Sequence, residues 1–440
     1  MASLRDRARW RNWAGNQVCA PTAIHQPSSE GEIVAIVQRA AAEGRRVRCV
    51  GAGHSFTGLV CTDGDLIDLS RYAEVLAVDR AAGLATVQAG IPLHRLSREL
   101  ATHGLALENL GDIAYQSVAG ATATATHGTG ARFRNLSSAI VAMRLVDGHG
   151  RVHDVSPDGD AADLVDIAPV GLGALGVVST VTIRCVPSFN LHAVEQAEPI
   201  DEVLERFDDE ADGTDHFELF WVPGTRWSLT KRNTRTQEPV RPLPTWRRWR
   251  DDIVYDNLAF GVLQKVARHR NDLVPAVARR LPSTGRRDYV DASYEVFASP
   301  RLVRFHEMEY AVPRDAGVAA LGEVRRLVDR LGYHVGFPVE VRVVAADDLA
   351  LSTASGRDTV YIACHVHRGV PQDAYFRGVE SIMDAHDGRP HWGKLHFQTA
   401  ATLAPRYPRW DDFAAARARL DPAGTFANPE LDRVLGPIGG

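Results

Sequence analysis

Cysteine is scarce in this 440-residue chain, and its five copies are scattered. They stand at positions 19, 49, 61, 185 and 364, and no two of them form a CxxC pair. Such a pattern excludes a disulfide framework and a cysteine-based zinc site. A redox reaction, if the protein performs one, would therefore need a bound cofactor.

Long apolar runs and strong net charge are also missing. No apolar run approaches the roughly 18 residues that a membrane span requires, and the basic N-terminal segment MASLRDRARWRNWAG lacks the apolar core of a signal peptide. The net charge of −5 is small for this length and gives no indication of nucleic-acid binding. These absences predict a cytoplasmic protein without a transmembrane segment and leave association with a membrane surface open.

A third glycine is missing from the first glycine-rich loop, VRCVGAGHSFTG (47–58). A Rossmann loop needs GxGxxG followed at once by a helix, whereas here the chain runs through HSFTGLVCTDG into a further strand, LIDLS. This excludes a nicotinamide-type Rossmann site. The loop instead carries a histidine, His54, directly after Gly51, Ala52 and Gly53, where the backbone is expected to approach a ligand closely.

Large side chains are nearly absent from a second stretch, GDIAYQSVAGATATATHGTG (111–130). Between Ser117 and Gly130 only Val118 and His127 are larger than threonine. Small residues allow either tight packing against a neighbouring element or backbone contact with a pyrophosphate, and this stretch alone does not distinguish the two. A further glycine-rich turn at 171–176 favours a nucleotide cofactor bound in an extended conformation.

The chain changes character near residue 190. Residues 1–188 predict an α+β domain with many short strands, including a hairpin across Asp147–Gly150. Between about 190 and 400, strands such as HEMEYAVP alternate with helices, which predicts an antiparallel sheet with helices on one side. The segment RPLPTWRRWRDD (241–252) predicts an exposed loop, with a docking patch for a membrane or an electron acceptor as the alternative.

Two strands of the second region bring polar residues to one face. In FPVEVRVVA the period of two places Glu340 and Arg342 together, either as a surface ion pair or as a functional pair. In YIACHVH the same period groups His365 with His367. A metal site built from these and the later histidines is disfavoured, because no carboxylate or cysteine completes a recognised ligand spacing.

Together these motifs resemble the vanillyl-alcohol-oxidase-type flavoproteins, and among them the aldonolactone oxidoreductases (L-gulono-1,4-lactone dehydrogenases and D-arabinono-1,4-lactone oxidases) and alditol oxidases. GAGHSFT resembles the loop whose histidine binds the flavin covalently, and QSVAGATATATHGTG resembles the loop for the pyrophosphate and the isoalloxazine ring. GALGVVSTVTI, PHWGK and DPAGTFANP are similar to further signatures in family order. The resemblance covers nearly the whole chain.

The resemblance implies a two-domain α+β fold of the VAO/PCMH type. An FAD-binding domain would span 1–188, an antiparallel-sheet cap domain 189–400, and a C-terminal segment, 401–440, would return to the FAD domain. FAD would be the cofactor, attached covalently to His54. The other implied cofactor-binding residues are Gly51, Ala52, Gly53, Ser55, Phe56, Gly111, Ser117, Gly120, Ala121, Thr124, Thr126, His127, Gly128, Gly176, Val177 and Asn428.

The implied reaction is oxidation of an aldono-1,4-lactone at C2 by hydride transfer to flavin N5, giving an ascorbate-type product. Glu340, Arg342 and Lys394 would bind substrate and stabilise charge, and His365 is a weaker candidate for proton acceptor. Oxygen or a cytochrome- or quinone-type acceptor would take the electrons, and no metal is expected. The alternatives are a carbohydrate oxidase acting on an open-chain polyol and a non-catalytic FAD-binding protein.

Overall fold

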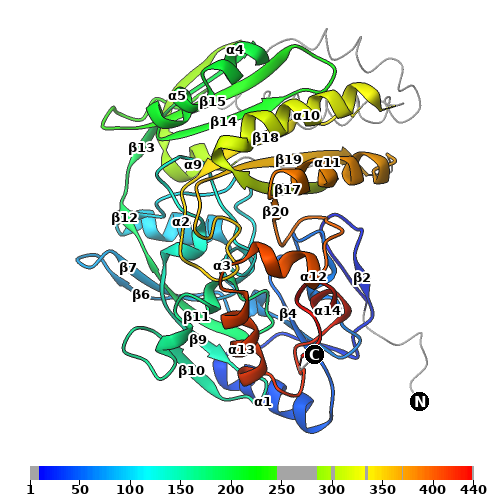
Figure 1. Ribbon diagram of the computed structural model, residues 1–440. Helices are drawn as coiled ribbons and strands as arrows, with labels where there is room; N and C mark the ends of the chain where they lie inside the picture. The colour runs from blue at the N-terminus through cyan, green and yellow to red at the C-terminus, as the bar shows by residue number, and fades with distance from the viewer. Residues whose placement is uncertain (1–8, 245–284, 299–302, 332–334, 369, 439–440) are drawn as a thin grey trace.

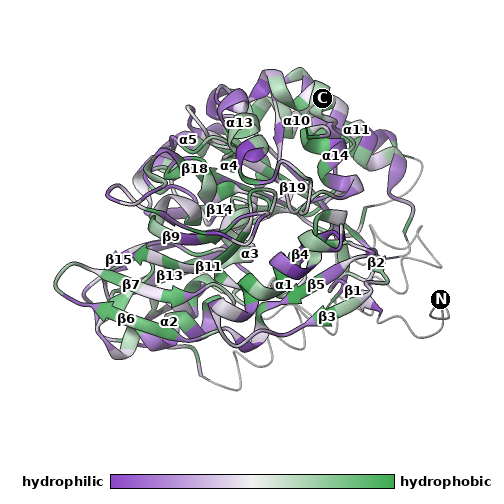
Figure 2. Cartoon of the chain, turned by 90° about the horizontal axis from the view of Figure 1, so that it is seen from below, coloured by the Kyte–Doolittle hydropathy of each residue, from purple (hydrophilic) through white to green (hydrophobic). Residues whose placement is uncertain are grey.

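The computed structural model describes residues 9–244, 285–298, 303–331, 335–368 and 370–438. The strands of these residues form five sheets. Figure 1 shows them in two halves, with the largest sheet in the upper half and smaller sheets below it. Figure 2 shows strands coloured largely as hydrophobic and outer helices that carry both hydrophobic and hydrophilic residues.

The N-terminal half begins with a parallel unit. β3 (Ala23–His25), β5 (Asp65–Asp68) and β4 (Val47–Val50) form a parallel sheet, and α1 (Glu30–Ala42) connects β3 to β4. Apolar residues at helical spacing in α1 face the core. The crossover leaves the first glycine-rich loop at the carboxyl end of β4, the usual ligand-binding edge of a parallel sheet.

An antiparallel sheet completes this half, in the order β10-β9-β11-β7-β6. The predicted hairpin is confirmed, because Val146 of β9 pairs with Val152 of β10. Helices α2 (Leu93–Thr102) and α3 (Val118–Ala123) bury their apolar residues in the same core. The strands are β6 (Val75–Asp79), β7 (Leu84–Gln88), β9 (Ile140–Val146), β10 (Val152–Val155) and β11 (Val177–Arg184), with two short pairs, β1 (Trp10–Arg11) with β2 (Val18–Cys19) and β8 (Leu105–Ala106) with β12 (Val186–Pro187).

The upper half is built on an antiparallel sheet of eight strands, in the order β16-β13-β15-β14-β18-β19-β17-β20. Every neighbouring pair in it is antiparallel, as the sequence predicts. The strands are β13 (Asn190–Pro199), β14 (His216–Trp221), β15 (Trp227–Thr236), β16 (Arg287–Ala292), β17 (Phe305–Pro313), β18 (Val339–Val344), β19 (Thr359–His367) and β20 (Arg389–Pro390).

One face of this sheet is apolar and carries helices. Val339, Val341 and Val343 of β18 share a core with four helices, which lie on the side of the sheet away from the N-terminal half in Figure 1. The alternate residues of each strand therefore face the N-terminal half. The helices are α4 (Ile200–Glu205), α5 (Phe207–Gly213), α10 (Gly317–Arg330) and α11 (Asp373–Ala385), and α9 (Ser293–Phe297) follows β16.

The C-terminal residues pack against the N-terminal half, where Figure 1 shows α12 (Ala400–Leu403), α13 (Trp410–Leu420) and α14 (Pro429–Leu435). Val47 N donates to Thr425 O at 2.7 Å, and Gly148 N donates to Leu420 O at 2.9 Å. Leu431 and Val434 lie in the same core as the antiparallel sheet. The domain boundaries at 188 and 400 stay predictions.

Two predictions concern the surface. Residues 245–252 of the Pro-, Arg- and Trp-rich segment lie outside the described residues, and Arg241 before them forms a bridge with Val290. Among the described residues, the helices are too short or too polar to cross a bilayer.

Candidate functional site

A cavity of about 1030 Å³, including space open to solvent, lies between the three glycine-rich segments of the N-terminal half. The structure thus brings together three segments that are more than 40 residues apart in the sequence. The predicted cofactor-binding residues that line the cavity are Gly51, Ala52, Gly53, His54, Ser55, Ser117, Gly120, Thr124 and Gly176.

The small residues around the cavity are required by the contacts between the segments themselves. A side-chain carbon at Gly51 would lie 1.9 Å from Ser117 Oγ, and one at Gly176 would lie 2.4 Å from Val146 O. Ser117 Oγ in turn accepts from Gly120 N at 3.2 Å and so caps α3. Tight packing and backbone access to a ligand, the two interpretations of this composition, therefore occur together.

His54 lies in the cavity wall with an unused nitrogen. Its Nδ1 is buried and has no hydrogen-bond partner among the described residues, and its ring lies 5.6 Å from that of Trp13 between centroids. Burial, helped by the positive charge of Lys394, lowers the pKa of His54 to about 4. The imidazole is therefore neutral near pH 7, and its buried, unpartnered nitrogen fits attachment to a flavin.

Arg48 is a cavity residue that the sequence reasoning missed. Its guanidinium is buried and donates to the carbonyl oxygens of Leu59, Gly173, Phe426 and Leu172 at 2.7 to 2.9 Å. Burial lowers its pKa to about 10, so it stays charged at neutral pH. Arg48 thus connects the first glycine-rich segment to the third and to the C-terminal segment.

Several predicted cofactor residues lie outside the cavity wall. Asn428 caps α14 and donates from Nδ2 to Gly58 O and Cys61 O, both at 2.9 Å. A side-chain carbon at Gly128 would lie 2.3 Å from Asn109 Oδ1. The structure therefore gives these residues packing and bracing contacts, and a direct role in cofactor binding stays a prediction. The same holds for Phe56, Gly111, Ala121, Thr126, His127 and Val177, which do not line the cavity either.

The polar face of the eight-stranded sheet carries a first buried charge cluster around Arg342. Arg342 Nε donates to Glu218 Oε2 at 2.8 Å, and its Nη2 contacts Glu340 Oε1. Lys231 Nζ lies 3.2 Å from Glu218 Oε1. Burial raises the pKa of Glu340 although Arg342 opposes the shift. Asp112 of the N-terminal half also raises this pKa, so the cluster faces that half.

Lys394 forms the centre of a second buried cluster on the same face. Its Nζ contacts Glu307 Oε2 and lies 3.8 Å from Glu309 Oε2. His365 Nε2 lies 3.4 Å from Glu307 Oε1. Burial alone would lower the pKa of Lys394, but the two carboxylates raise it above its usual value, so the ammonium remains charged.

The turn that carries Lys394 rests on the His54 loop. Phe56 N donates to Gly393 O at 2.7 Å, and Lys394 Nζ lies 5.5 Å from the centroid of the Phe56 ring. Lys394 lowers the pKa of His54 through its charge. The turn therefore places a fixed cation beside the predicted attachment point, at the junction of the two halves.

Three glutamates of these clusters were missed by sequence reasoning. Glu218, Glu307 and Glu309 occur in HFELFW and HEMEYAVP, where the period of two places them opposite apolar residues. The same alternation of polar and apolar residues indicated Glu340 and Arg342, so the sequence pattern that could have identified the three glutamates was present. Period alone does not tell whether the polar face of a strand meets solvent or a second domain.

Solved structures share this fold over almost the full length of the chain. A structure entitled solvent-stable cholesterol oxidase covers 98% of this chain and 98% of its own, with a TM-score of 0.80 at 21% identity. The structure of cholesterol oxidase from B. sterolicum covers 99% and 98%, with a TM-score of 0.80 at 17% identity. These similarities confirm the predicted fold class.

Sequence comparisons give the family. A model described as D-arabinono-1,4-lactone oxidase matches residues 181–434, and a model described as FAD binding domain matches residues 21–156. L-gulono-1,4-lactone dehydrogenase of Mycobacterium tuberculosis is 48% identical over 97% of this chain and 99% of its own length. L-gulonolactone oxidase of Bos taurus is 32% identical over 97% and 98%, and alditol oxidase of a Streptomyces species 32% over 96% and 98%. The chain therefore belongs to the D-arabinono-1,4-lactone oxidase family and has an FAD-binding domain.

Proposed function

We propose that this protein is an FAD-dependent oxidoreductase that oxidises an aldono-1,4-lactone at C2. The main support for the proposal is the position of Lys394, whose Nζ contacts Glu307 on the polar face of the eight-stranded sheet and whose turn also rests on the His54 loop. A fixed positive charge at this junction would stabilise the negative charge that develops during the oxidation. The lactone-oxidising relatives named above support the choice of substrate class.

The cavity residues fit FAD, which would lie among Gly51–Ser55, Ser117–Thr124 and Gly171–Gly176. When bound, FAD supplies the two-electron oxidant that takes a hydride from the substrate carbon. Arg342 and Lys394 bind and polarise the hydroxyl groups. Glu340 is suited to accept the hydroxyl proton, because burial raises its pKa above the usual value of a carboxyl group and so makes it a stronger base. His365 is less suited to accept this proton. Burial would lower the pKa of His365, but Glu307 raises it above its usual value, so the imidazole favours its protonated form.

The alternative substrate is an open-chain polyol, the class of substrate that the name of the alditol oxidase relative indicates. Turnover of L-gulono-, L-galactono- and D-arabinono-1,4-lactone should be compared with that of polyols, in air and with cytochrome c as acceptor. We expect turnover of at least one lactone well above that of every polyol. Preferential turnover of polyols would replace the lactone assignment, and turnover of neither would favour a non-catalytic FAD-binding protein.

The electron acceptor and the location are proposals of the same kind. We expect oxygen or a cytochrome- or quinone-type acceptor, and a cytoplasmic protein. This chain is similar to a relative named as a dehydrogenase and to a relative named as an oxidase, so the names of the relatives do not choose between the acceptors. Comparing air with cytochrome c in the experiment above distinguishes the acceptors.

A further inference from the structure

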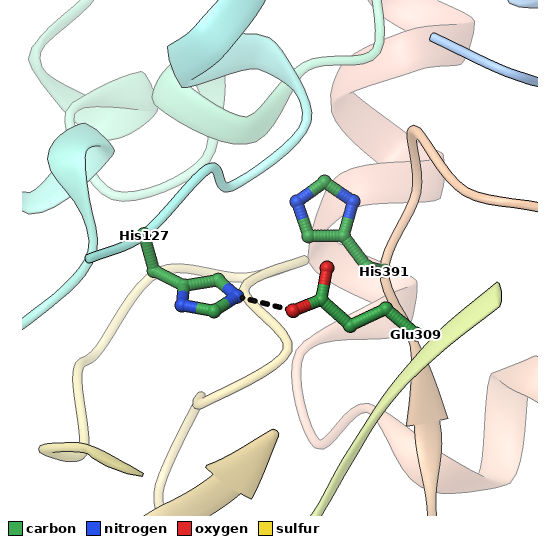
Figure 3. A group of neighbouring side chains, drawn as sticks. All are labelled: His127, Glu309 and His391. Carbon is green, nitrogen blue, oxygen red and sulfur yellow. Dashed lines mark hydrogen bonds and ion pairs between the residues drawn. The ribbon is translucent and has the colours of Figure 1, made fainter. Parts of the chain in front are cut away.

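Two imidazole–carboxylate pairs flank Lys394. Glu307 and Glu309 are buried neighbours on the polar face of β17, and both contact or approach Lys394 Nζ. His365 of β19 pairs with Glu307 at 3.4 Å, and His127 of the N-terminal half pairs with Glu309 at 3.1 Å. The His127–Glu309 pair therefore connects the glycine- and threonine-rich stretch 111–130 to the eight-stranded sheet, and Figure 3 shows its two side chains.

The hydrogen bonds of the two imidazoles locate protons in these pairs. His127 Nδ1 lies 2.8 Å from Gly128 O, and His365 Nδ1 lies 2.9 Å from Pro338 O. A carbonyl oxygen only accepts, so each Nδ1 must carry the hydrogen. Each Nε2 then faces a carboxylate oxygen, and two lone pairs would meet unless a proton lies between them. Each pair therefore holds one proton.

These two protons reverse the local charge. One ammonium against two carboxylates leaves a single negative charge beside the His54 loop. Two further protons turn this into a single positive charge. The stacking of His127 on Tyr361, with ring centroids 3.6 Å apart, fixes the orientation of the imidazole that holds one of them.

Other titratable groups also face Lys394 or the pairs. His391 Nδ1 accepts from Gly393 N at 3.0 Å, and burial lowers the pKa of His391 to about 3, so this ring is neutral. Further titratable groups are His54 on the His54 loop, Glu340 on β18, and Tyr361 and Cys364 on β19. None of them supplies a second cation to replace the protons of the two pairs.

We propose that Glu309 and His127 are positioning residues, which hold the ammonium of Lys394 against the His54 loop and keep the local charge positive. Glu307, which contacts Lys394, and its partner His365 support the ammonium in the same way. The effect on turnover rests on the function proposed above. Ligand atoms of His127, Glu309 and His391 lie within 4.8 Å of one another, close enough for a metal ion, but the ammonium already neutralises the second oxygen of Glu309.

Glu309→Gln tests the proposal because it removes the charge and keeps the shape. The proton of the pair is lost together with the carboxylate, so the net local charge stays the same, but Lys394 loses one of the two carboxylates that raise its pKa and should release its proton at lower pH. We expect the alkaline limb of the kcat/KM profile for a lactone to move down by about one pH unit, and kcat to fall about tenfold with less change in KM. In the Lys394→Met background, Glu309→Gln should have little further effect.

The second readout needs no turnover. Proton NMR of the wild-type holoprotein should show a downfield imidazole N–H resonance from the buried His127–Glu309 pair, absent in both His127→Gln and Glu309→Gln. Glu323→Gln is the matched control, because Glu323 Oε1 and His386 Nε2 form a similar pair of 3.2 Å at the surface. It should leave the profile and this resonance unchanged.

Three results would overturn the proposal. They are an alkaline limb that stays in place in Glu309→Gln, a wild-type spectrum in which no downfield resonance is lost in both variants, and stoichiometric metal in the wild type that Glu309→Gln loses. If no lactone is turned over, the proposed function fails, whereas the NMR comparison still decides whether the pair holds a proton.

Discussion

At the scale of single residues, His54 has the most specific expected chemistry. Its buried Nδ1 has no partner among the described residues, and burial together with Lys394 holds its pKa at about 4. A neutral nitrogen in a cavity wall can form a bond to a cofactor, whereas a protonated one cannot. The resemblance in GAGHSFT points to the same bond, which stays a prediction.

His54→Ala should remove the covalent link and leave the cavity otherwise intact. Denatured wild-type protein is expected to keep a yellow, fluorescent band on a denaturing gel, and the variant band is expected to be colourless while its native form still binds FAD. His94→Ala, at a half-buried histidine outside the cavity, should keep the fluorescence. A colourless wild-type band would contradict the linkage.

At the scale of elements, β18 shows how strand period creates the site. Val339, Val341 and Val343 enter the helix-covered core, and Glu340 and Arg342 consequently face the N-terminal half. Arg342 there balances Glu340 and Glu218. Removing one partner of such a buried group leaves the others without compensation.

Arg342→Ala should therefore abolish most turnover while bound FAD remains. We expect kcat/KM for a lactone to fall by at least a hundredfold, with the flavin absorbance per protein unchanged. Arg325→Ala, which removes an exposed ion pair between α10 and Asp201, serves as the control and should change neither. Undiminished turnover of Arg342→Ala would remove Arg342 from the site.

The elements also show what the sequence could predict. Period and turn composition predict the antiparallel sheet, its helix-covered face and the hairpin at Asp147–Gly150, because these depend on neighbours in the chain. Glu218 and Arg342 are more than a hundred residues apart in the sequence, and they pair only because β14 lies beside β18. Arg48 depends on Phe426 O, 378 residues away. Local patterns contain no information about such long-range contacts.

At the scale of the whole molecule, buried neutral histidines should make the protein sensitive to acid. Burial lowers the pKa of His216 to about 4, as it does for His54, and that of His391 to about 3. Between pH 6.5 and these values the unfolded chain binds protons that the folded chain does not. Stability therefore falls as the pH falls through this range.

The size of the effect follows from the shift. His216 alone should contribute a loss of up to about 3 kcal/mol in the free energy of unfolding between pH 6.5 and 4. Denaturant unfolding at several pH values from 7 to 4.5 measures it, and His216→Gln should show a shallower decline. Equal slopes for the variant and the wild type would show that His216 does not titrate in this way.

On the proposed function, the two halves of the molecule form one site in which FAD oxidises a sugar lactone. Anaerobic mixing of the purified holoprotein with each of the three lactones tests this most directly, since it needs no electron acceptor. We expect the flavin absorbance to bleach rapidly with at least one lactone and to return when air or cytochrome c is added. A flavin that stays oxidised with every lactone, in protein with a full complement of FAD, would contradict it.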